Sequence, residues 1–254
     1  MIHTQKIALV TGAGKRLGRS IALGLASAGW DMVVHYRSSA NEAEATAEEI
    51  RQLGRQAIVL DADLADEASC RDLLPRAIAR IGPISCVVNS ASLFTYDDAS
   101  TFSVKMLDQH MRANLAAPVL LSQALHDATP EGLQSVVINL LDQKLFNPNP
   151  DFLSYTLSKA GLQSATVLLA QALAPRVRVV GLAPGLTLVS GDQTEQGFAA
   201  AHTKTPLGKS STPDDIAAAA CYLAHAEAIT GTVLVVDGGQ HLMPMSRDVM
   251  FVAK

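Results

Sequence analysis

The sequence predicts an α/β fold in which helices cover both faces of a doubly wound, seven-stranded parallel sheet. Three observations lead to this expectation. Short apolar runs alternate with segments of helical periodicity along almost the whole chain. A glycine-rich turn joins the first apolar run to the first helical segment. No internal repeat or long linker interrupts the alternation, which is typical of parallel strands joined by right-handed crossovers.

The expected elements follow from these patterns in chain order. Strands are expected at 6–11, 31–36, 56–61, 84–89, 134–141, 176–182 and 232–236. Helices are expected at 17–29, 40–53, 66–81, 102–127, 152–174 and 213–225. We expect one domain over 1–254. The stretch from about 185 to 212 lacks a clear period, and a loop of that length in a compact domain is expected to be a substrate lid.

Composition narrows the class of protein. Hydrophobic residues make up 48% of the 254 residues, yet no run of eighteen apolar residues could span a membrane, and no secretory signal begins the chain. A formal charge of −4 predicts no nucleic-acid partner. The three cysteines are widely spaced, which indicates free thiols rather than disulfides or a metal site. The expectation is a cytoplasmic enzyme with a small-molecule substrate and no metal.

The glycine-rich turn predicts a phosphate site. A short apolar run, 6–10, passes directly into Thr11-Gly12-Ala13-Gly14-Lys15-Arg16-Leu17-Gly18 and then into a helical pattern. Its glycines allow a tight turn and a close approach to a pyrophosphate. The free N–H groups at the start of the following helix favour an anion.

The second strand predicts which dinucleotide binds. A site that prefers NAD normally carries an acid near the end of this strand, but here Asp31 stands at its beginning. Arg37, Ser38 and Ser39 follow the strand, and Arg16 approaches from the glycine-rich turn. Guanidinium and hydroxyl groups suit a 2′-phosphate, so NADPH is the predicted cofactor. The alternative is that Arg37 is only a solvated surface charge.

Tyr155 and Lys159 predict a proton donor. Residues four apart lie on one face of a helix, so the ammonium would stabilise the phenolate and lower the pKa of Tyr155 toward the working pH. Such a pair is weak evidence alone, because it often arises by chance. Asp142 stands thirteen residues before Tyr155.

Together these motifs resemble those of the short-chain dehydrogenase/reductases, over residues 5 to 241. The matching segments are Thr11-Gly12 with Leu17-Gly18, Asn89-Ser90-Ala91-Ser92, Asn114, Tyr155 with Lys159, Pro184-Gly185 and Asp237-Gly238-Gly239. Within the family the chain is most similar to pteridine reductases and bacterial dihydromonapterin/dihydrofolate reductases. Arg16, the segment 35–39, and Asp142 where most members have Ser carry this closer likeness.

The resemblance implies a Rossmann-type fold, a homotetramer and a set of site residues. Tyr155 would donate the proton, with Asp142 as its partner, Lys159 beside it, and Asn114 anchoring a water path to Lys159. The implied cofactor residues are Gly12, Lys15, Arg16, Leu17, Gly18, His35, Tyr36, Arg37, Ser38, Ser39, Asp63, Leu64, Ser90, Ala91, Ser92, Tyr155, Lys159, Pro184, Gly185, Leu186 and Thr187. A second interpretation is that Ser90 and Ser92 merely cap the next helix.

Asp142 favours one substrate class. Reduction of a ketone develops negative charge on oxygen, which a carboxylate would repel. Reduction of a C=N bond adds a proton to nitrogen, which a carboxyl near Tyr155 can help to deliver. The alternative is that Asp142 only caps the following loop while Asn139 or Gln143 acts instead. The implied substrate residues are Ser92, Phe94, Asp142, Phe146, Tyr155 and Leu186.

The predicted function is NADPH-dependent reduction of a pterin or dihydrofolate C=N bond. Phe94 is expected to stack on such a flat heteroaromatic ring, although it could instead anchor the core. The main alternative is an NADPH-dependent ketoreductase acting on an oxoacyl thioester or another carbonyl. A cofactor-binding sensor without catalysis is a third possibility, but it would not need Tyr155, Lys159 and Asn114 together.

Overall fold

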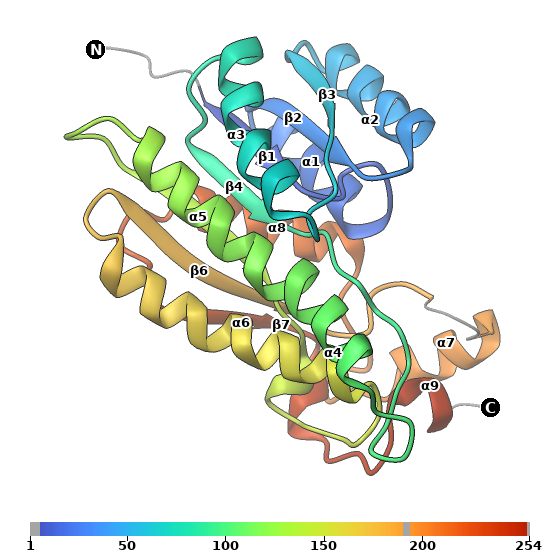
Figure 1. The fold of residues 1–254 in the computed structure, drawn as a ribbon. Coiled ribbons are helices and arrows are strands. Elements are labelled where there is room, and N and C mark those ends of the chain that lie inside the picture. The colour runs from blue at the N-terminus through green and yellow to red at the C-terminus, as the bar shows by residue number, and fades with distance from the viewer. Residues whose placement is uncertain (1–5, 190–193, 253–254) are drawn as a thin grey trace.

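A seven-stranded parallel sheet forms the centre of the protein in this computed structural model, which describes residues 6–189 and 194–252 (Figure 1). Its order is β3-β2-β1-β4-β5-β6-β7, and each pairing of neighbours is parallel. The strands are β1 (Ile7–Val10), β2 (Asp31–Tyr36), β3 (Ala57–Asp61), β4 (Cys86–Asn89), β5 (Ser135–Leu140), β6 (Val177–Pro184) and β7 (Val233–Val236). This confirms the predicted doubly wound fold.

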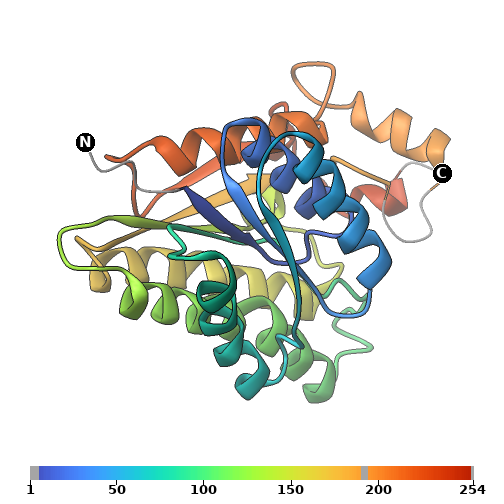
Figure 2. The ribbon, with the colours of Figure 1, turned by 90° about the horizontal axis from the view of Figure 1, so that it is seen from above.

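Helices cover both faces of the sheet (Figure 2). One face carries α1 (Arg16–Ser27), α2 (Ala40–Gln52) and α8 (Pro213–His225), and the other carries α3 (Glu67–Ile81), α5 (Ala117–Ala128) and α6 (Leu153–Ala172). In β1, Ala8 and Val10 pack into the first of these cores while Ile7 and Leu9 pack into the second. Burial on both faces explains why the strands are continuous apolar runs.

Two segments differ from the sequence-based expectation. The single helix expected over 102–127 is divided into α4 (Val104–Met111), a π-helical turn η1 (Arg112–Ala116) and α5. The expected lid contains a short helix, α7 (Glu195–His202), which Thr194 caps by accepting a hydrogen bond from Gly197 N–H. Residues 190–193 of that lid lie outside the described part of the chain.

Shorter elements complete the described fold. They are the 3₁₀ turns η2 (Gln143–Leu145) and η3 (Gln240–Leu242) and the terminal helix α9 (Val249–Val252), which contacts α7. In both views α9 lies beside α7, near the C-terminus (Figures 1 and 2). Of the described helices, none has the length and apolar character needed to cross a bilayer.

His35, near the end of β2, ties together the loops that follow β1 and β3. Its Nδ1 accepts a hydrogen bond from Gly12 N–H at 3.1 Å, and its Nε2 lies 3.1 Å from the carbonyl oxygen of Ala62. A carbonyl can only accept, so these contacts select the neutral imidazole with its proton on Nε2. The ring is 2% exposed and therefore holds the glycine-rich turn in place from inside the protein.

His35 should make the stability of the fold depend on pH. Burial lowers the pKa of His35 from 6.5 to about 4. At pH values between these two, the unfolded chain therefore binds a proton on His35 and the folded protein does not. The contribution of His35 to the free energy of unfolding is therefore fully present above pH 6.5 and declines as the pH falls toward 4. We expect the free energy of unfolding to drop by about 2 kcal/mol from pH 7.5 to pH 5, as measured by urea titration.

His35→Asn should flatten this pH dependence, because Asn still offers Gly12 an acceptor but does not titrate. His126→Asn is the matched control, since it makes the same substitution on α5, away from the glycine-rich turn. An identical slope in wild type and His35→Asn would contradict the assignment.

Candidate active site

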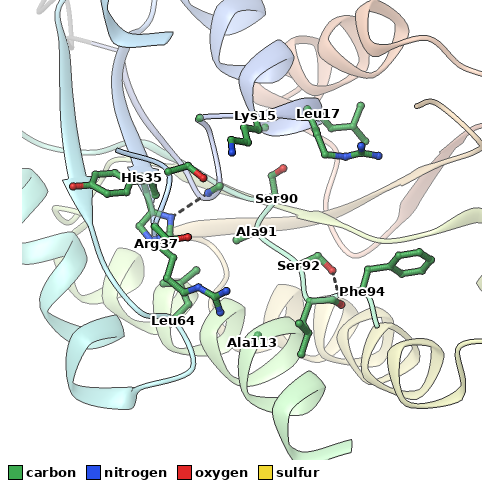
Figure 3. A pocket seen from close by; sticks show the side chains of 18 of the residues that line it. Lys15, Leu17, His35, Arg37, Leu64, Ser90, Ala91, Ser92, Phe94 and Ala113 are labelled. Carbon is green, nitrogen blue, oxygen red and sulfur yellow. Dashed lines mark hydrogen bonds between the residues drawn. The ribbon is translucent and has the colours of Figure 1, made fainter. Parts of the chain in front are cut away.

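A cavity of about 620 Å³ follows the carboxyl ends of β1 to β4, where the strand order reverses (Figure 3). Figure 3 shows Arg37 near Leu64 at one end of the row of lining residues and Phe94 beyond Ser92 at the other. Predicted site residues that line the cavity are Gly12, Lys15, Arg16, Leu17, Gly18, His35, Tyr36, Arg37, Ser38, Ser39, Asp63, Leu64, Ser90, Ala91, Ser92, Phe94, Asp142, Tyr155, Leu186 and Thr187.

The glycine-rich turn is built for close approach. Gly12 has a φ of +66°, which disfavours any side chain there. A Cβ on Gly18 would lie 2.3 Å from the carbonyl oxygen of Gly12, so only glycine allows α1 to begin this near to β1. Lys15 precedes α1 without a capping side-chain hydrogen bond, and the first N–H groups of the helix therefore suit an external anion.

The corner after β2 carries positive charge and hydroxyl groups. Arg37, Ser38 and Ser39 line it, whereas the Asp31 carboxylate at the start of β2 accepts hydrogen bonds from the Arg55 side chain and a backbone N–H. No described acid at the end of β2 could therefore take a ribose hydroxyl, as the sequence predicted. These groups fit a dinucleotide that carries a 2′-phosphate.

Arg16 has partners in addition to those expected. Its backbone adopts a φ of +54°, and its Nη1 donates to the carbonyl oxygen of Val189 at 2.9 Å. The guanidinium therefore links the glycine-rich turn to the segment after β6. Lys15 forms an ion pair with Glu42 at 2.6 Å. Convergence of Arg16 with Arg37 on one phosphate stays a prediction.

The region after β3 fits its predicted place beside the cofactor. Asp63 and Leu64 line the cavity, and one carboxylate oxygen of Asp63 accepts a hydrogen bond from Ala65 N–H at 3.0 Å. Ala62, whose carbonyl oxygen contacts His35, also lines it. The predicted hydrogen bond from Asp63 to an adenine stays a prediction.

Asp142 and Tyr155 form the chemical centre of the site. The Tyr155 hydroxyl donates to Asp142 Oδ2 at 2.8 Å, while Asp142 Oδ1 accepts from Lys144 N–H at 2.8 Å. Asp142 therefore caps the η2 turn and also contacts the tyrosine, so the two roles considered for it are compatible. Of the described residues, Asn139 and Gln143 do not line the cavity, and Asn139 is hydrogen-bonded inside the core to Asn89 and Thr166.

The predicted lowering of the Tyr155 pKa is wrong. Burial, and then the adjacent Asp142 charge, raise the pKa of Tyr155 well above its ordinary value. Lys159 directs its ammonium to the carbonyl oxygen of Leu140 at 2.7 Å and lies 5.8 Å from the centroid of the tyrosine ring. Burial lowers the pKa of Lys159 to about 8 and raises the pKa of Asp142. The tyrosine is thus a protonated phenol beside a carboxyl that ionises less readily than usual.

Asn114 lies in the π turn and joins three segments. Its Oδ1 accepts from Leu93 N–H at 2.7 Å, and its Nδ2 donates to the Leu93 carbonyl and to Ser158 Oγ. These contacts hold the chain after β4 against α6; among the described residues none of them reaches Lys159. Asn114 is fully buried and does not line the cavity. The geometry thus gives Asn114 a positioning role, and its expected place on a water path to Lys159 stays a prediction.

The two serines after β4 do not cap the next helix. Ser103 does so, by accepting a hydrogen bond from Met106 N–H. Ser90 and Ser92 instead line the cavity, and Ser92 Oγ lies 3.3 Å from Asn114 Oδ1.

Phe94 reaches the cavity but also packs against protein. Its ring stacks on Phe152 at a centroid distance of 4.2 Å and meets Tyr155 edge-on at 4.7 Å. One face of the Phe94 ring packs against Phe152, and because the side chain is 41% exposed, part of its surface is accessible to a ligand. Phe146, the other predicted aromatic, lies outside the described cavity lining and contacts His241.

Three further predicted residues, Lys159, Pro184 and Gly185, also lie outside the lining. A Cβ on Gly185 would approach Asp237 and Ser210 to 2.6 Å, so the close packing of β6 on the chain after β7 requires this glycine. Lys159 is buried, with its ammonium 5.8 Å from the centroid of the Tyr155 ring. The Pro184-Gly185 motif therefore shapes the wall behind Leu186 and Thr187.

The sequence did not predict the charged residues that lie near Asp142 on the side away from Tyr155. Lys144, Asp151, Arg247 and Asp248 form ion pairs there, although about a hundred residues separate the first two from the last two. No local pattern in the sequence marks such a contact. The described residues contain no group of three side chains able to hold a metal ion.

Known proteins share this fold and these motifs. A family profile described as enoyl-(acyl carrier protein) reductase matches residues 12–241. The crystal structure of FolM alternative dihydrofolate reductase 1 from Brucella canis, complexed with NADP, superposes with a TM-score of 0.88 at 39% identity, covering 94% of this chain and 95% of that one.

Curated relatives carry other activities in their names. The 2-dehydro-3-deoxy-D-gluconate 5-dehydrogenase of Escherichia coli is 34% identical over 92% of this chain and 94% of its own length. The 3-oxoacyl-[acyl-carrier-protein] reductase FabG of Staphylococcus aureus is 30% identical over 93% and 98%. The chain belongs to the short-chain dehydrogenase/reductase family of oxidoreductases.

Proposed function

We propose that this enzyme uses NADPH to reduce a C=N bond in a pterin or dihydrofolate-type substrate. The observation that carries the proposal is the 2.8 Å hydrogen bond between Tyr155 and the buried carboxyl of Asp142. FolM, described as an alternative dihydrofolate reductase, is similar along nearly the whole chain, which adds support. The NADP bound to that relative agrees with the residues that line the corner after β2.

NADPH, when bound, supplies the hydride that adds to the carbon of the C=N bond. The residues of this chain then deliver the proton to nitrogen. Tyr155 donates it, because its phenol lines the cavity. Asp142 replaces it across the 2.8 Å hydrogen bond when the carboxyl is protonated, and burial, which raises the pKa of Asp142, favours that protonated form. Lys159, 5.8 Å from the ring centroid, offsets the transient phenolate charge.

The same pair disfavours ketones as substrates. A developing alkoxide needs donors and positive charge, and Asp142 would repel it whenever the carboxyl is ionised, whereas proton delivery to nitrogen uses the protonated carboxyl. A pterin offers amino and ring N–H groups, which a carboxylate attracts. The principal alternative is a ketoreductase, in line with the 3-oxoacyl-[acyl-carrier-protein] reductase named among the relatives.

A spectrophotometric assay of NADPH oxidation separates these functions. Dihydrobiopterin, dihydromonapterin and dihydrofolate are compared with an acetoacetyl thioester at equal concentration. We expect at least one dihydropterin or dihydrofolate to give the highest kcat/KM. A higher kcat/KM with the thioester would establish the ketoreductase instead.

Cofactor preference should depend on Arg37. We expect kcat/KM with NADPH to exceed that with NADH by at least about tenfold, roughly 1.4 kcal/mol, because the corner after β2 offers a guanidinium and no acid. Arg37→Ala should weaken NADPH binding and leave NADH almost unaffected, as measured by fluorescence titration of each cofactor. Arg112→Gln, at the first residue of the π turn and outside the cavity lining, is the control for loss of a positive charge. Equal efficiency of both cofactors with the wild-type enzyme would refute the assignment.

Catalysis should require the carboxyl of Asp142. Tyr155→Phe is expected to lower turnover by about 10² to 10⁴, the usual span for a general acid, with cofactor affinity near normal. Asp142→Ser restores the residue common in the family and should depress pterin reduction while raising carbonyl reduction. Asp142→Asn is the matched control, because it keeps a side chain of the same size but has no proton to pass. Unchanged pterin turnover in Asp142→Ser would remove the carboxyl from the mechanism.

Assembly into a homotetramer is also proposed. The outer side of α6 exposes Leu157, Val167 and Leu168, the last at 64%, which is unusual for apolar side chains on one helix. Light scattering at micromolar concentration should give about 107 kDa, four times the chain mass of 26.8 kDa. Leu168→Glu should reduce this mass. Leu53→Glu, which replaces another exposed leucine but lies outside α6, should leave the mass unchanged. A monomeric wild-type mass would overturn the proposal.

A further inference from the structure

The chain just before α9 is anchored to the loop that precedes the catalytic helix. Asp151, whose side chain is 3% exposed, forms an ion pair with Arg247 Nη2 at 2.7 Å. The same carboxylate accepts a hydrogen bond from Asp248 N–H at 2.7 Å. Buried carboxylates need such partners, so these bonds fix the position of residues 247 and 248 relative to α6.

Lys144 connects this anchored segment to the chemical centre. Its backbone N–H donates to Asp142 Oδ1 at 2.8 Å, the opposite oxygen from the one that contacts Tyr155. Its ammonium, 4% exposed as a side chain, donates to the Asp151 carbonyl oxygen and lies 3.4 Å from Asp248 Oδ2. One residue therefore bonds to Asp142 through its backbone and to the C-terminal segment through its side chain.

An aromatic stack provides a second connection. Arg247 lies 4.9 Å from the centroid of Phe251, which stacks on Phe152. Phe152 in turn stacks on Phe94, a residue that lines the cavity. The C-terminal segment thus reaches both the proton-donating pair and the aromatic wall of the cavity.

The charges of Lys144 and Asp248 act on Asp142 across a medium of low dielectric. Burial is the main reason that the pKa of Asp142 is raised; the Asp248 charge raises it further, and the Lys144 charge lowers it. Other charged or titratable groups on the elements around this centre are Tyr155 and Lys159 on α6, Asp151 and Arg247 in the anchor, Asp97 between β4 and α4, which accepts a hydrogen bond from Ser154 N–H, and Asp237 with His241 near η3.

We propose that Lys144 and Asp248 are positioning residues through which the C-terminal segment controls how readily Asp142 passes a proton to Tyr155. The inference rests on the proposed role of Asp142. It assigns a catalytic consequence to residues that touch neither substrate nor cofactor. The two charges have opposite effects on Asp142. The negative charge of Asp248 favours the protonated carboxyl, and the positive charge of Lys144 favours loss of the proton.

The test measures the titration of Asp142 in two variants with opposite charge changes. Asp248→Asn removes the negative charge and should lower the pH at which Asp142 loses its proton by about half a pH unit. Lys144→Met removes the positive charge and should raise that pH by a similar amount. Carboxyl carbon NMR of protein with ¹³C-labelled aspartate, with Asp142→Asn identifying the signal, reports this titration without substrate. The falling limb of kcat against pH, with the best substrate, should move in the same directions.

Asp127→Asn, a carboxylate that is 71% exposed on α5, is the control and should leave both measurements unchanged. If Lys144→Met does not fold, Asp248→Asn decides alone, because it preserves the size of the side chain. Unchanged titration of Asp142 in Asp248→Asn, or shifts of both variants in one direction, would overturn the proposal. Opposite shifts by NMR in an enzyme inactive on pterins would uphold this inference while refuting the proposed function.

Discussion

A carboxyl group removed from water must find donors, and this requirement organises the catalytic half of the protein. Asp142 follows β5 and is held by Lys144 N–H on one oxygen and by the Tyr155 hydroxyl on the other. The end of β5, the η2 turn and the start of α6 must therefore keep fixed relative positions. The buried ammonium of Lys144 also needs partners, and it finds them in the Asp151 carbonyl oxygen and the Asp248 carboxylate. The chain before α9 is therefore held in place as well.

In the opposite half of the cavity a neutral ring holds the glycine-rich turn. His35 accepts a hydrogen bond from Gly12 and donates one to Ala62, and it does so without a charge of its own. Gly18 lets α1 approach that turn closely. The protein thus positions the glycine-rich turn through a neutral side chain and the surroundings of Asp142 through buried ion pairs.

Features encoded locally could be predicted from the sequence. The alternating strands and helices, the glycine-rich turn and the residues after β2 all follow from neighbours within a few positions, and the structure has them where expected. The direction of the Tyr155 pKa could not be predicted, because it depends on burial and on where Lys159 points. The ion pairs of Asp151 and Lys144 with the C-terminal segment join residues about a hundred positions apart, and spacing alone carries no information on them. Phe146 and Gly185 matched expected positions in the sequence, but packing against His241 and Asp237 placed them elsewhere.

The π turn at 112–116 has a consequence for how this region can change. A π turn holds one more residue than an α-helical turn, and each residue advances an α-helix by about 100°. Deleting a single residue here would restore a continuous helix and leave α4 and α5 nearly in their present relative orientation, because the wide turn absorbs the extra residue. The loss would fall on Asn114, which contacts Leu93 and Ser158 from within the turn and so holds the chain after β4 against α6. The wide turn thus lets one side chain reach two partners while the helices on either side keep their packing.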